Sequence, residues 1–155
     1  MPGTGDPQGR LPDRVFLPDE KEEFFRGVDY LVLAMPLTPE TRGIVGAAEL
    51  ALLRPSAAIL NPARGPLIEE EPLLTALRER RFRAAALDTH FRYPLPPEHE
   101  LWGMENVILT PHISGSSENP HFLMRIWDIF SENIDLYLRE QPLINEVDPV
   151  ELAAG

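Results

Sequence analysis

Residues that can bind an acid and transfer a proton follow three short apolar runs of this chain. Arg64 closes "SAAILNPAR", Asp88 and His90 close "RAAALDTH", and His112 stands in "NVILTPHIS". A guanidinium matches the planar geometry of a carboxylate, and an imidazole exchanges protons near neutral pH. Taken singly, an Arg after a strand is often a surface ion-pair residue and a lone His is usually structural. Their common place after apolar runs favours a reaction centre.

The apolar runs predict a parallel sheet. Four of them, "DYLVLAMPL", "SAAILNPAR", "RAAALDTH" and "NVILTPHIS", are too short for independent helices and lack strict alternation. That pattern is typical of strands covered on both faces. "RVFL" at 14–17 is a weaker fifth candidate. Because ligands of an open parallel sheet bind outside the carboxyl ends of its strands, the residues after each run are expected to meet at one edge.

Helical segments separate these runs. Early acids and a late Gly or Arg mark "PDEKEEFFRG", "GAAELALLRP" and "EEEPLLTALRERR" as helices. The strand starts lie about 25 residues apart, a natural length for a βαβ unit with a right-handed crossover. The sequence therefore predicts an α/β fold with a doubly wound, Rossmann-like parallel sheet.

The chain divides into three predicted parts. Residues 1–13 are rich in Gly and Pro and are expected to be a disordered lead, 14–118 hold the sheet, and 119–155 hold a long helix and a tail. The helix is expected to start near Asn119 with Pro120 at its first position. An apolar face, expected to pack on the domain, is formed by Phe122, Ile126, Ile129, Phe130, Asn133, Leu136 and Tyr137. The tail "LINEVDP" is expected to run extended.

Composition excludes several classes of partner. The net charge of −11 argues against nucleic acid and anionic membranes, which demand basic patches. No window approaches 18 uninterrupted apolar residues, and the N-terminus has no basic segment followed by an apolar one, so neither a membrane span nor a signal peptide is predicted. With no Cys there is no disulfide and no thiolate metal site; no metal is expected, and a cytoplasmic location is the default.

Three longer stretches resemble a known family. "VDYLVLAMPLTPETRGIV", "AILNPARGPLIEEEPLLTALRERRFRAAALD" and "LWGMENVILTPHISG" are similar, in the correct order, to the D-isomer-specific 2-hydroxyacid dehydrogenases. Within that family, these stretches look most like the glyoxylate/hydroxypyruvate reductase branch. The resemblance runs from about Val15 to Asp148. It covers only the C-terminal half of the family's NAD-binding domain and the helix that follows.

The resemblance implies hydride transfer between NAD or NADP and a small 2-keto or 2-hydroxy acid. Arg64 resembles the substrate-binding Arg, and His112 in "TPHISG" resembles the catalytic acid/base. Asp88 matches the position that meets the nicotinamide carboxamide. Further positions that match the cofactor lining are Pro36, Pro62, Ala63, Ser114 and Gly115. His90 could approach the site, although the family usually has an apolar or small residue there, and His99 and His121 are expected to be solvated off the strand ends.

Tyr93 departs from the family pattern. The family carries a Glu before the Pro of the "PLP" segment, where it orients the imidazole and raises its pKa. A phenol can accept a hydrogen bond from the imidazole but brings no charge at pH 7. Losing such an orienting partner costs roughly a few kcal/mol of transition-state stabilisation. We therefore place Tyr93 with the catalytic residues and expect it to impair activity.

The glycine fingerprint of dinucleotide binding is the second departure. "GTGDPQG" at 3–9 has its glycines at the wrong spacing, contains Pro7 and follows no strand. Without the helix N-terminus that holds a diphosphate, cofactor affinity should be low. We expect a truncated dehydrogenase that is inactive alone. The alternative is a non-catalytic module derived from the family, which dimerises or binds an intact relative.

Overall fold

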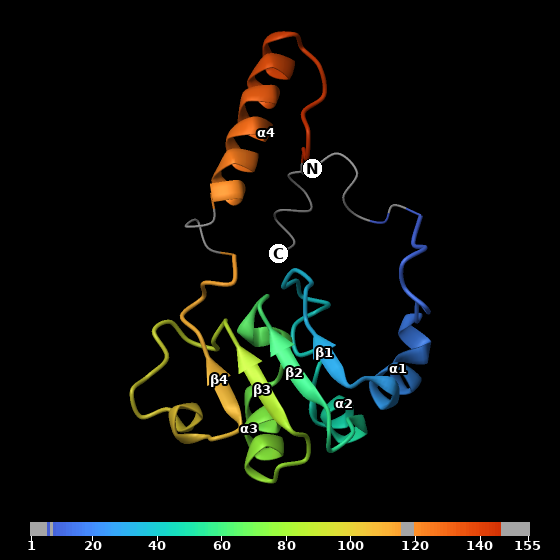
Figure 1. The fold of residues 1–155 in the computed structure, drawn as a ribbon, viewed down its shortest axis with the longest axis vertical. Helices are drawn as coiled ribbons and strands as arrows, with labels where there is room; N and C mark the ends of the chain where they lie inside the picture. Colours follow the sequence, from blue (N-terminus) through green and yellow to red (C-terminus); the bar gives the residue numbers. More distant parts are fainter. Residues whose placement is uncertain (1–5, 7, 116–119, 147–155) are drawn as a thin grey trace. The chain divides into compact units, whose positions relative to one another are not determined.

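The computed structural model describes residue 6, residues 8–115 and residues 120–146. Two compact units divide the chain: residues 16–114 form one, and residues 1–15 with 115–155 form the other (Figure 1). The elements in chain order are α1 (Lys21–Gly27), β1 (Tyr30–Val32), α2 (Ala47–Leu52), β2 (Ala58–Asn61), α3 (Glu70–Arg78), β3 (Ala84–Leu87), β4 (Val107–Leu109) and α4 (Pro120–Leu138), with 3₁₀ turns at Pro18–Glu20, Gly65–Leu67 and Glu100–Gly103.

The four predicted apolar runs form one parallel sheet in the order β1-β2-β3-β4. This confirms the α/β, Rossmann-like fold class, and Figure 1 shows the four arrows pointing the same way. All four carboxyl ends therefore lie at one edge. We call the segments that follow the strands, 33–46, 62–65, 88–93 and 110–114, the carboxyl edge, and the segments that precede them, 28–29, 53–57, 79–83 and 103–106, the amino edge.

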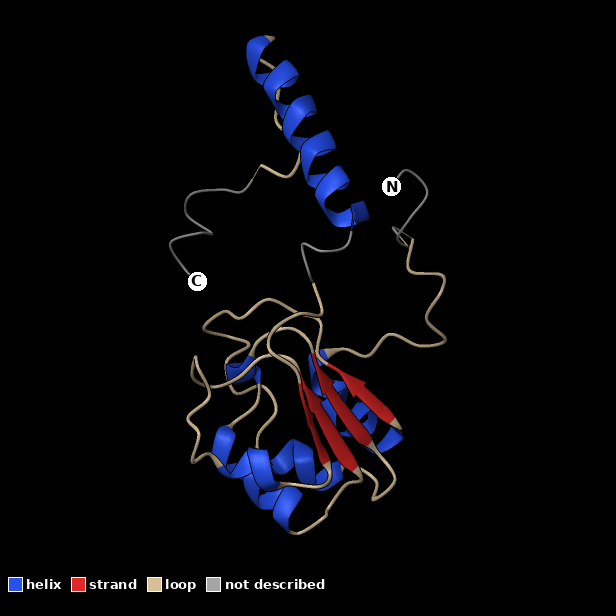
Figure 2. Ribbon diagram, turned by 60° about the vertical axis from the view of Figure 1, so that its left-hand side comes forward, coloured by secondary structure: helices blue, strands red, loops and turns tan. Residues whose placement is uncertain are grey.

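The three predicted helices form close to their expected bounds. Gly46 N donates to Glu49 Oε2 at 2.8 Å, which satisfies a free amide at the start of α2. Lys21 joins α1 to α2 through an ion pair with Glu49 at 2.6 Å. Figure 2 shows these helices on one side of the sheet. For α2 and α3, which connect neighbouring parallel strands, this follows from right-handed crossovers between strands in sequential order.

The core lies between that side of the sheet and the helices. In register, Leu31 pairs with Ile59 and Ile59 with Ala85, and all three are buried. Burial of such apolar side chains contributes about 25 cal/mol per Å² of area removed from water. Helix residues at the centre of the core include Leu50, Leu73, Leu74 and Leu77.

The opposite side of the sheet differs from the prediction of strands covered on both faces. Its central row is Val32, Leu60, Ala86 and Ile108. Val32 is 53 % exposed and Ile108 is 64 % exposed. Short apolar runs predicted strands correctly, but the number of covered faces depends on elements elsewhere in the fold. The weaker candidate strand "RVFL" was wrong, because residues 14–17 form no strand.

The second unit contains α4, which begins at Pro120 as predicted. Its apolar face is largely exposed, including Phe122, Ile126 and Phe130. The tail was expected to be extended, and this is wrong for its described part. Asn133 Nδ2 donates to Ile144 O at 3.1 Å, and Ile144 N donates to Asn133 Oδ1 at 2.7 Å, so the chain turns back onto the helix. The predicted lead at 1–13 lies partly outside the described residues.

Candidate active site

The structure places the sequence-predicted residues of the first unit on the carboxyl edge. Pro36 follows β1, and Pro62, Ala63 and Arg64 follow β2. Asp88 and Tyr93 follow β3, and the residues that follow β4 are His112 and Ser114. Gly115 is exposed and belongs to the second unit.

Asn61 holds the loop that carries Arg64. Its side chain is buried, with 1 % exposed. Asn61 Nδ2 donates to Arg64 O at 2.8 Å, while Ala63 N donates to Asn61 Oδ1 at 3.1 Å. Arg64 is exposed, and its Nη1 donates to Ala63 O at 2.7 Å. The fold thus fixes the backbone of this loop and leaves most of the guanidinium donors available.

Asp88 connects the end of β3 to the loop after β4. It is 6 % exposed. Its Oδ1 accepts hydrogen bonds from Thr110 Oγ1 and from Ile113 N, the latter at 2.9 Å. Its Oδ2 accepts from Ser114 N at 3.0 Å and from Ser114 Oγ at 2.6 Å. A carboxylate offers about four acceptor sites, so these donors occupy all of them.

These contacts keep Asp88 ionised. Burial acts to raise the pKa of the Asp88 carboxyl, but the hydrogen bonds from Ser114, Thr110 and Ile113 stabilise the anion and outweigh burial. The pKa of Asp88 therefore lies well below its ordinary value. A nicotinamide carboxamide would have to displace one of these donors to reach the carboxylate.

His112 lies between the residues that Asp88 holds. Its backbone has a φ of 60°, a region that non-glycine residues rarely occupy. The side chain is exposed, and its ring centroid lies 5.8 Å from that of Tyr93, with the planes tilted by 35°. Among the described residues, no carboxylate forms an ion pair with His112. The imidazole is thus exposed on its loop and lies beside the aromatic ring of Tyr93.

Tyr93 does not contact His112 in the way the sequence suggested. Its Oη accepts a hydrogen bond from His90 N at 3.0 Å, and it contacts His112 ring to ring. The Tyr93 side chain is 57 % exposed. The phenol oxygen is therefore engaged by backbone, and the imidazole has an aromatic neighbour where an acceptor was expected.

Gly65, which sequence reasoning missed, brings the Arg64 loop against the segment after β3. A Cβ at this position would lie 2.4 Å from His90 O and 2.9 Å from Phe91 N. No side chain fits there, so only glycine allows this approach. The sequence signal was a glycine immediately after Arg64, but nothing in the sequence named the backbone it would touch.

The remaining histidines differ from one another. His99 was expected to be solvated, and this is wrong: its side chain is 13 % exposed and Nε2 lies 2.9 Å from Glu70 Oε1. His121 is exposed on α4, in the second unit. His90 is buried on the carboxyl edge, with 7 % exposed.

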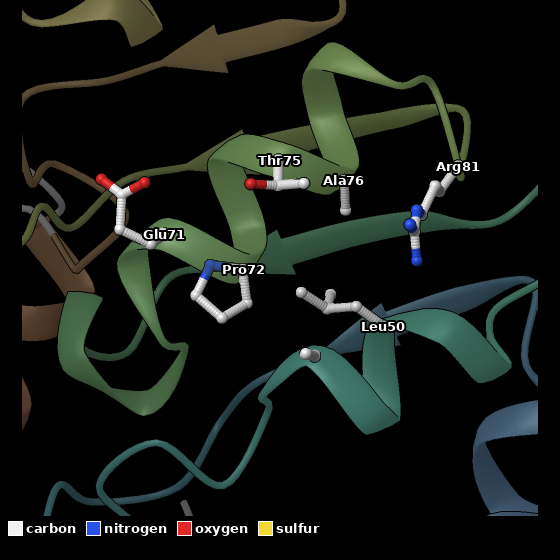
Figure 3. Close-up of a pocket in the computed structure, with 7 residues that line it drawn as sticks. Leu50, Glu71, Pro72, Thr75, Ala76 and Arg81 are labelled. Carbon is white, nitrogen blue, oxygen red and sulfur yellow. The ribbon is translucent and has the colours of Figure 1, made fainter.

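Hollows of the first unit lie both at the strand ends and between two helices. One, of about 150 Å³, lies at the carboxyl ends of the strands and is lined by Val32, Leu60, Asn61, Pro62, Ala86, Leu87, Asp88, Ile108 and Thr110. The other, of about 290 Å³, lies between α2 and α3 (Figure 3). Its charged residues are already paired, Glu71 with Arg78 and Arg81 with Glu79. Only the first hollow includes residues predicted to line a cofactor, Pro62 and Asp88.

Other kinds of site find no support in the part of the chain that the structure describes. No group of three or more His, Asp or Glu side chains there could hold a metal ion. No helix there is long and apolar enough to cross a membrane.

A family model matches most of the chain. Residues 6–114 match the D-isomer specific 2-hydroxyacid dehydrogenase, NAD binding domain. The hydroxypyruvate reductase of Blautia hydrogenotrophica is 36 % identical over 124 residues, which cover 80 % of this chain and 38 % of that protein. The chain thus spans less than half the length of this relative.

Solved structures give the same result. A D-isomer specific 2-hydroxyacid dehydrogenase from Xanthobacter autotrophicus, in complex with NADPH and MES, is 37 % identical and superposes with a TM-score of 0.77 over 86 % of this chain and 54 % of that one. The NADPH-dependent glyoxylate/hydroxypyruvate reductase of Sinorhizobium meliloti, in complex with NADP and sulfate, is 32 % identical, with a TM-score of 0.78 over 87 % of this chain and 43 % of that one. The matched motifs, the parallel sheet and these relatives together show that the chain belongs to the D-isomer-specific 2-hydroxyacid dehydrogenase family and carries part of its NAD-binding domain.

Proposed function

We propose that this chain supplies the acid/base and acid-binding groups of an NAD(P)-dependent oxidoreductase acting on small 2-keto and 2-hydroxy acids, similar to glyoxylate/hydroxypyruvate reductases. The observation that carries the proposal is that Arg64 and His112 remain exposed on loops whose backbones Asn61 and Asp88 hold firmly. When the backbone of a loop is fixed and its side chains form no ion pair, those side chains can bind a ligand at low entropic cost.

The chemistry follows from the two side chains. The Arg64 guanidinium binds the carboxylate of a 2-keto acid and polarises its keto oxygen. A reduced nicotinamide bound beside Pro62 would supply the hydride for the keto carbon. The His112 imidazolium donates its proton to the oxygen, which gives the hydroxy acid; in the reverse direction neutral His112 removes that proton.

The cofactor is NAD or NADP, and the carboxyl edge supplies part of its binding surface. Pro62 lines the hollow at the strand ends. Pro36 and Ala63 follow β1 and β2, and Ser114 and Gly115 follow His112 in the chain. Asp88 serves mainly as an anchor of the His112 loop, because its acceptor sites are already used. Relatives with NADPH or NADP bound support the class of cofactor without deciding between the two.

We further infer that the 155 residues on their own reduce little or no keto acid. No G-x-G-x-x-G turn occurs in the sequence, and a diphosphate is normally held by such a turn and the helix that follows it. A chimera tests the chemistry directly: this chain replaces the part of the Sinorhizobium meliloti reductase that it matches. NADPH oxidation is then measured with glyoxylate and hydroxypyruvate.

The chimera should reduce both acids, and His112→Gln should lower kcat roughly 10²- to 10⁴-fold, since a positioned proton donor is lost. Arg64→Ala should mainly raise KM for the acid. The matched control is His121→Gln on α4, which should change neither. A chimera that binds NADPH but turns over no faster than its His112→Gln variant would contradict the proposal.

Tyr93 sets the level of activity. In the chimera, Tyr93→Glu should raise kcat by roughly 10-fold or more, because a carboxylate beside His112 favours the imidazolium that donates the proton. The rise should be larger at higher pH, where an unassisted imidazole is neutral. If Tyr93→Glu lowers kcat at every pH, the missing charge beside His112 is not what limits the reaction.

A second candidate function is a non-catalytic dimerisation module. The exposed apolar residues of α4, among them Trp127 and Phe130, favour it, since large apolar patches usually mark interaction surfaces. Sedimentation equilibrium of the chain separates the two: a monodisperse dimer that Trp127→Glu dissociates supports the module. A monomer at all concentrations, or open-ended aggregation, contradicts it.

A further inference from the structure

His90 is a buried imidazole that neither the proposed reaction nor the core explains. Only 7 % of it is exposed, and its Nε2 lies 3.0 Å from Thr110 O. Because a carbonyl oxygen can only accept, Nε2 carries a proton in this contact. Nδ1 is buried and has no hydrogen-bond partner among the described residues. A merely structural histidine is usually satisfied at both nitrogens.

The backbone of His90 is also fixed. Its N–H donates to Tyr93 Oη at 3.0 Å, and the two rings lie 5.8 Å apart at their centroids. Gly65 packs against its carbonyl so closely that a Cβ there would lie 2.4 Å from His90 O. His90 therefore cannot shift without moving the Arg64 loop.

Both contacts of His90 lead to His112. Through Nε2 it holds Thr110 O, two residues before His112. Through its N–H it holds the phenol whose ring lies 5.8 Å from the His112 ring. Asp88 fixes the other side of the same loop by accepting from Ile113 N and Ser114 N. A residue at a φ of 60° needs such contacts on both sides, because the conformation persists only where the surroundings determine it.

We propose that His90 is a positioning residue for His112: together with Tyr93 it holds the imidazole in the orientation from which it transfers a proton. The proposal rests on the proposed function only in giving His112 that task. His90 is too deeply buried to touch a substrate itself, so its part is to hold the loop that carries the exposed His112. The pair of His90 and Tyr93 is thus a built arrangement, with the phenol oxygen and the imidazole each bound to the backbone of a different loop.

The experiment follows the histidine ring signals of the full 155-residue chain by two-dimensional NMR. His90→Leu removes the donor to Thr110 O and should shift the His112 ring signals and abolish the nuclear Overhauser contacts between His112 and Tyr93. His90→Gln keeps an N–H donor at similar length and should restore most of both. Tyr93→Phe keeps the ring but removes the oxygen held by His90 N, and should weaken the contacts in part.

His99→Leu is the matched control. It removes a similar contact, between Nε2 and Glu70 Oε1 at 2.9 Å, from a histidine outside the carboxyl edge. It should leave the His112 signals in place. Unchanged His112 signals in His90→Leu, or an equal shift in His99→Leu, would overturn the proposal. If His90→Leu fails to fold, His90→Gln and Tyr93→Phe decide: an unaltered His112–Tyr93 contact in Tyr93→Phe overturns it.

The proposed function is tested separately, since the NMR experiment needs no cofactor or substrate. In an active chimera, His90→Leu should lower kcat by roughly 10- to 100-fold, as a misplaced catalytic group does, and should leave KM for the acid nearly unchanged. An unchanged kcat would overturn the positioning role while leaving the proposed function standing. An inactive chimera counts against the proposed function, and the NMR result still decides the position of His112.

Discussion

The two edges of the sheet use their arginines differently. At the amino edge each described arginine has a partner on a neighbouring segment or within its own: Arg54 with Asp29 at 3.5 Å, Arg80 with Glu105 at 3.2 Å, Arg81 with Glu79 at 2.6 Å, and Arg83 with Tyr30 Oη at 3.2 Å. At the carboxyl edge, Arg42, Arg64 and Arg92 form no ion pair with any residue that the structure describes. Those three follow β1, β2 and β3 in turn.

The difference is informative because acids are plentiful in this chain. With 25 acidic and 14 basic residues, an unpaired guanidinium is not a consequence of missing carboxylates. Two buried polar side chains, Asn61 at the end of β2 and Asp88, instead bind the backbone of the carboxyl edge. The arginines of the amino edge are thus used within the fold, whereas those of the carboxyl edge form no ion pair with any described residue.

Removing the buried Asp88 carboxylate should give the largest loss of stability at the carboxyl edge. Asp88→Asn puts an amide where four donors point, and we expect the free energy of unfolding to fall by about 3 kcal/mol, because buried donors lose a charged acceptor. Urea unfolding followed by circular dichroism measures this, and hydrogen exchange should show the amides of Ile113 and Ser114 opening. Asp29→Asn at the amino edge should cost no more than about 0.5 kcal/mol. Equal losses at the two edges would remove the distinction.

A smaller effect is expected from the close approach at Gly65. Gly65→Ala places a methyl 2.4 Å from His90 O, and we expect a loss of about 2 kcal/mol as the two loops separate. Gly103 at the amino edge has nothing within 4 Å of its would-be Cβ. Gly103→Ala should therefore change stability by less than about 0.5 kcal/mol. Thermal melts of both variants make the comparison, and a neutral Gly65→Ala would show that the loops are not packed together.

The pH dependence of stability should also originate at the carboxyl edge. The folded-state pKa of Asp88 is lowered, so its contribution to the unfolding free energy is present above the ordinary aspartate pKa and is lost as pH falls toward the folded-state pKa. The stability gap between the unmodified chain and Asp88→Asn should narrow below about pH 4. Urea midpoints from neutral to acid pH measure it. A gap of constant size would mean that the carboxyl is not held as an anion.

The smallest expected effect separates stability from binding. Arg64→Ala should leave the unfolding free energy within about 0.5 kcal/mol of the unmodified chain, since the side chain is exposed and unpaired. Arg54→Ala should lower it slightly, by about 0.5 kcal/mol, through loss of a surface ion pair. Parallel urea titrations test the pair. A large loss of unfolding free energy in Arg64→Ala would show that this arginine stabilises the fold and is not available for a ligand.

The sequence by itself determined the four strands, the helices and the common edge at which the candidate site residues lie. Apolar runs are local, and the acids and glycines that begin and end helices act on adjacent residues, so both can be read without knowing the fold. Motif order likewise placed Arg64 and His112 on loops after β2 and β4. Four residues of "RVFL" misled because strand propensity produces a strand only beside a partner strand.

Only the tertiary structure decided how those loops are held. Asp88 finds its donors 22 to 26 residues away, and Gly65 meets His90, 25 residues further on. The tertiary structure also decided which residues of the sheet are exposed, from Val32 to Ile108. It likewise decided that His99 contacts Glu70 and that Tyr93 contacts both His90 and His112. Contacts between segments far apart in sequence depend on the packing of the whole sheet, and no local pattern of residues specifies them.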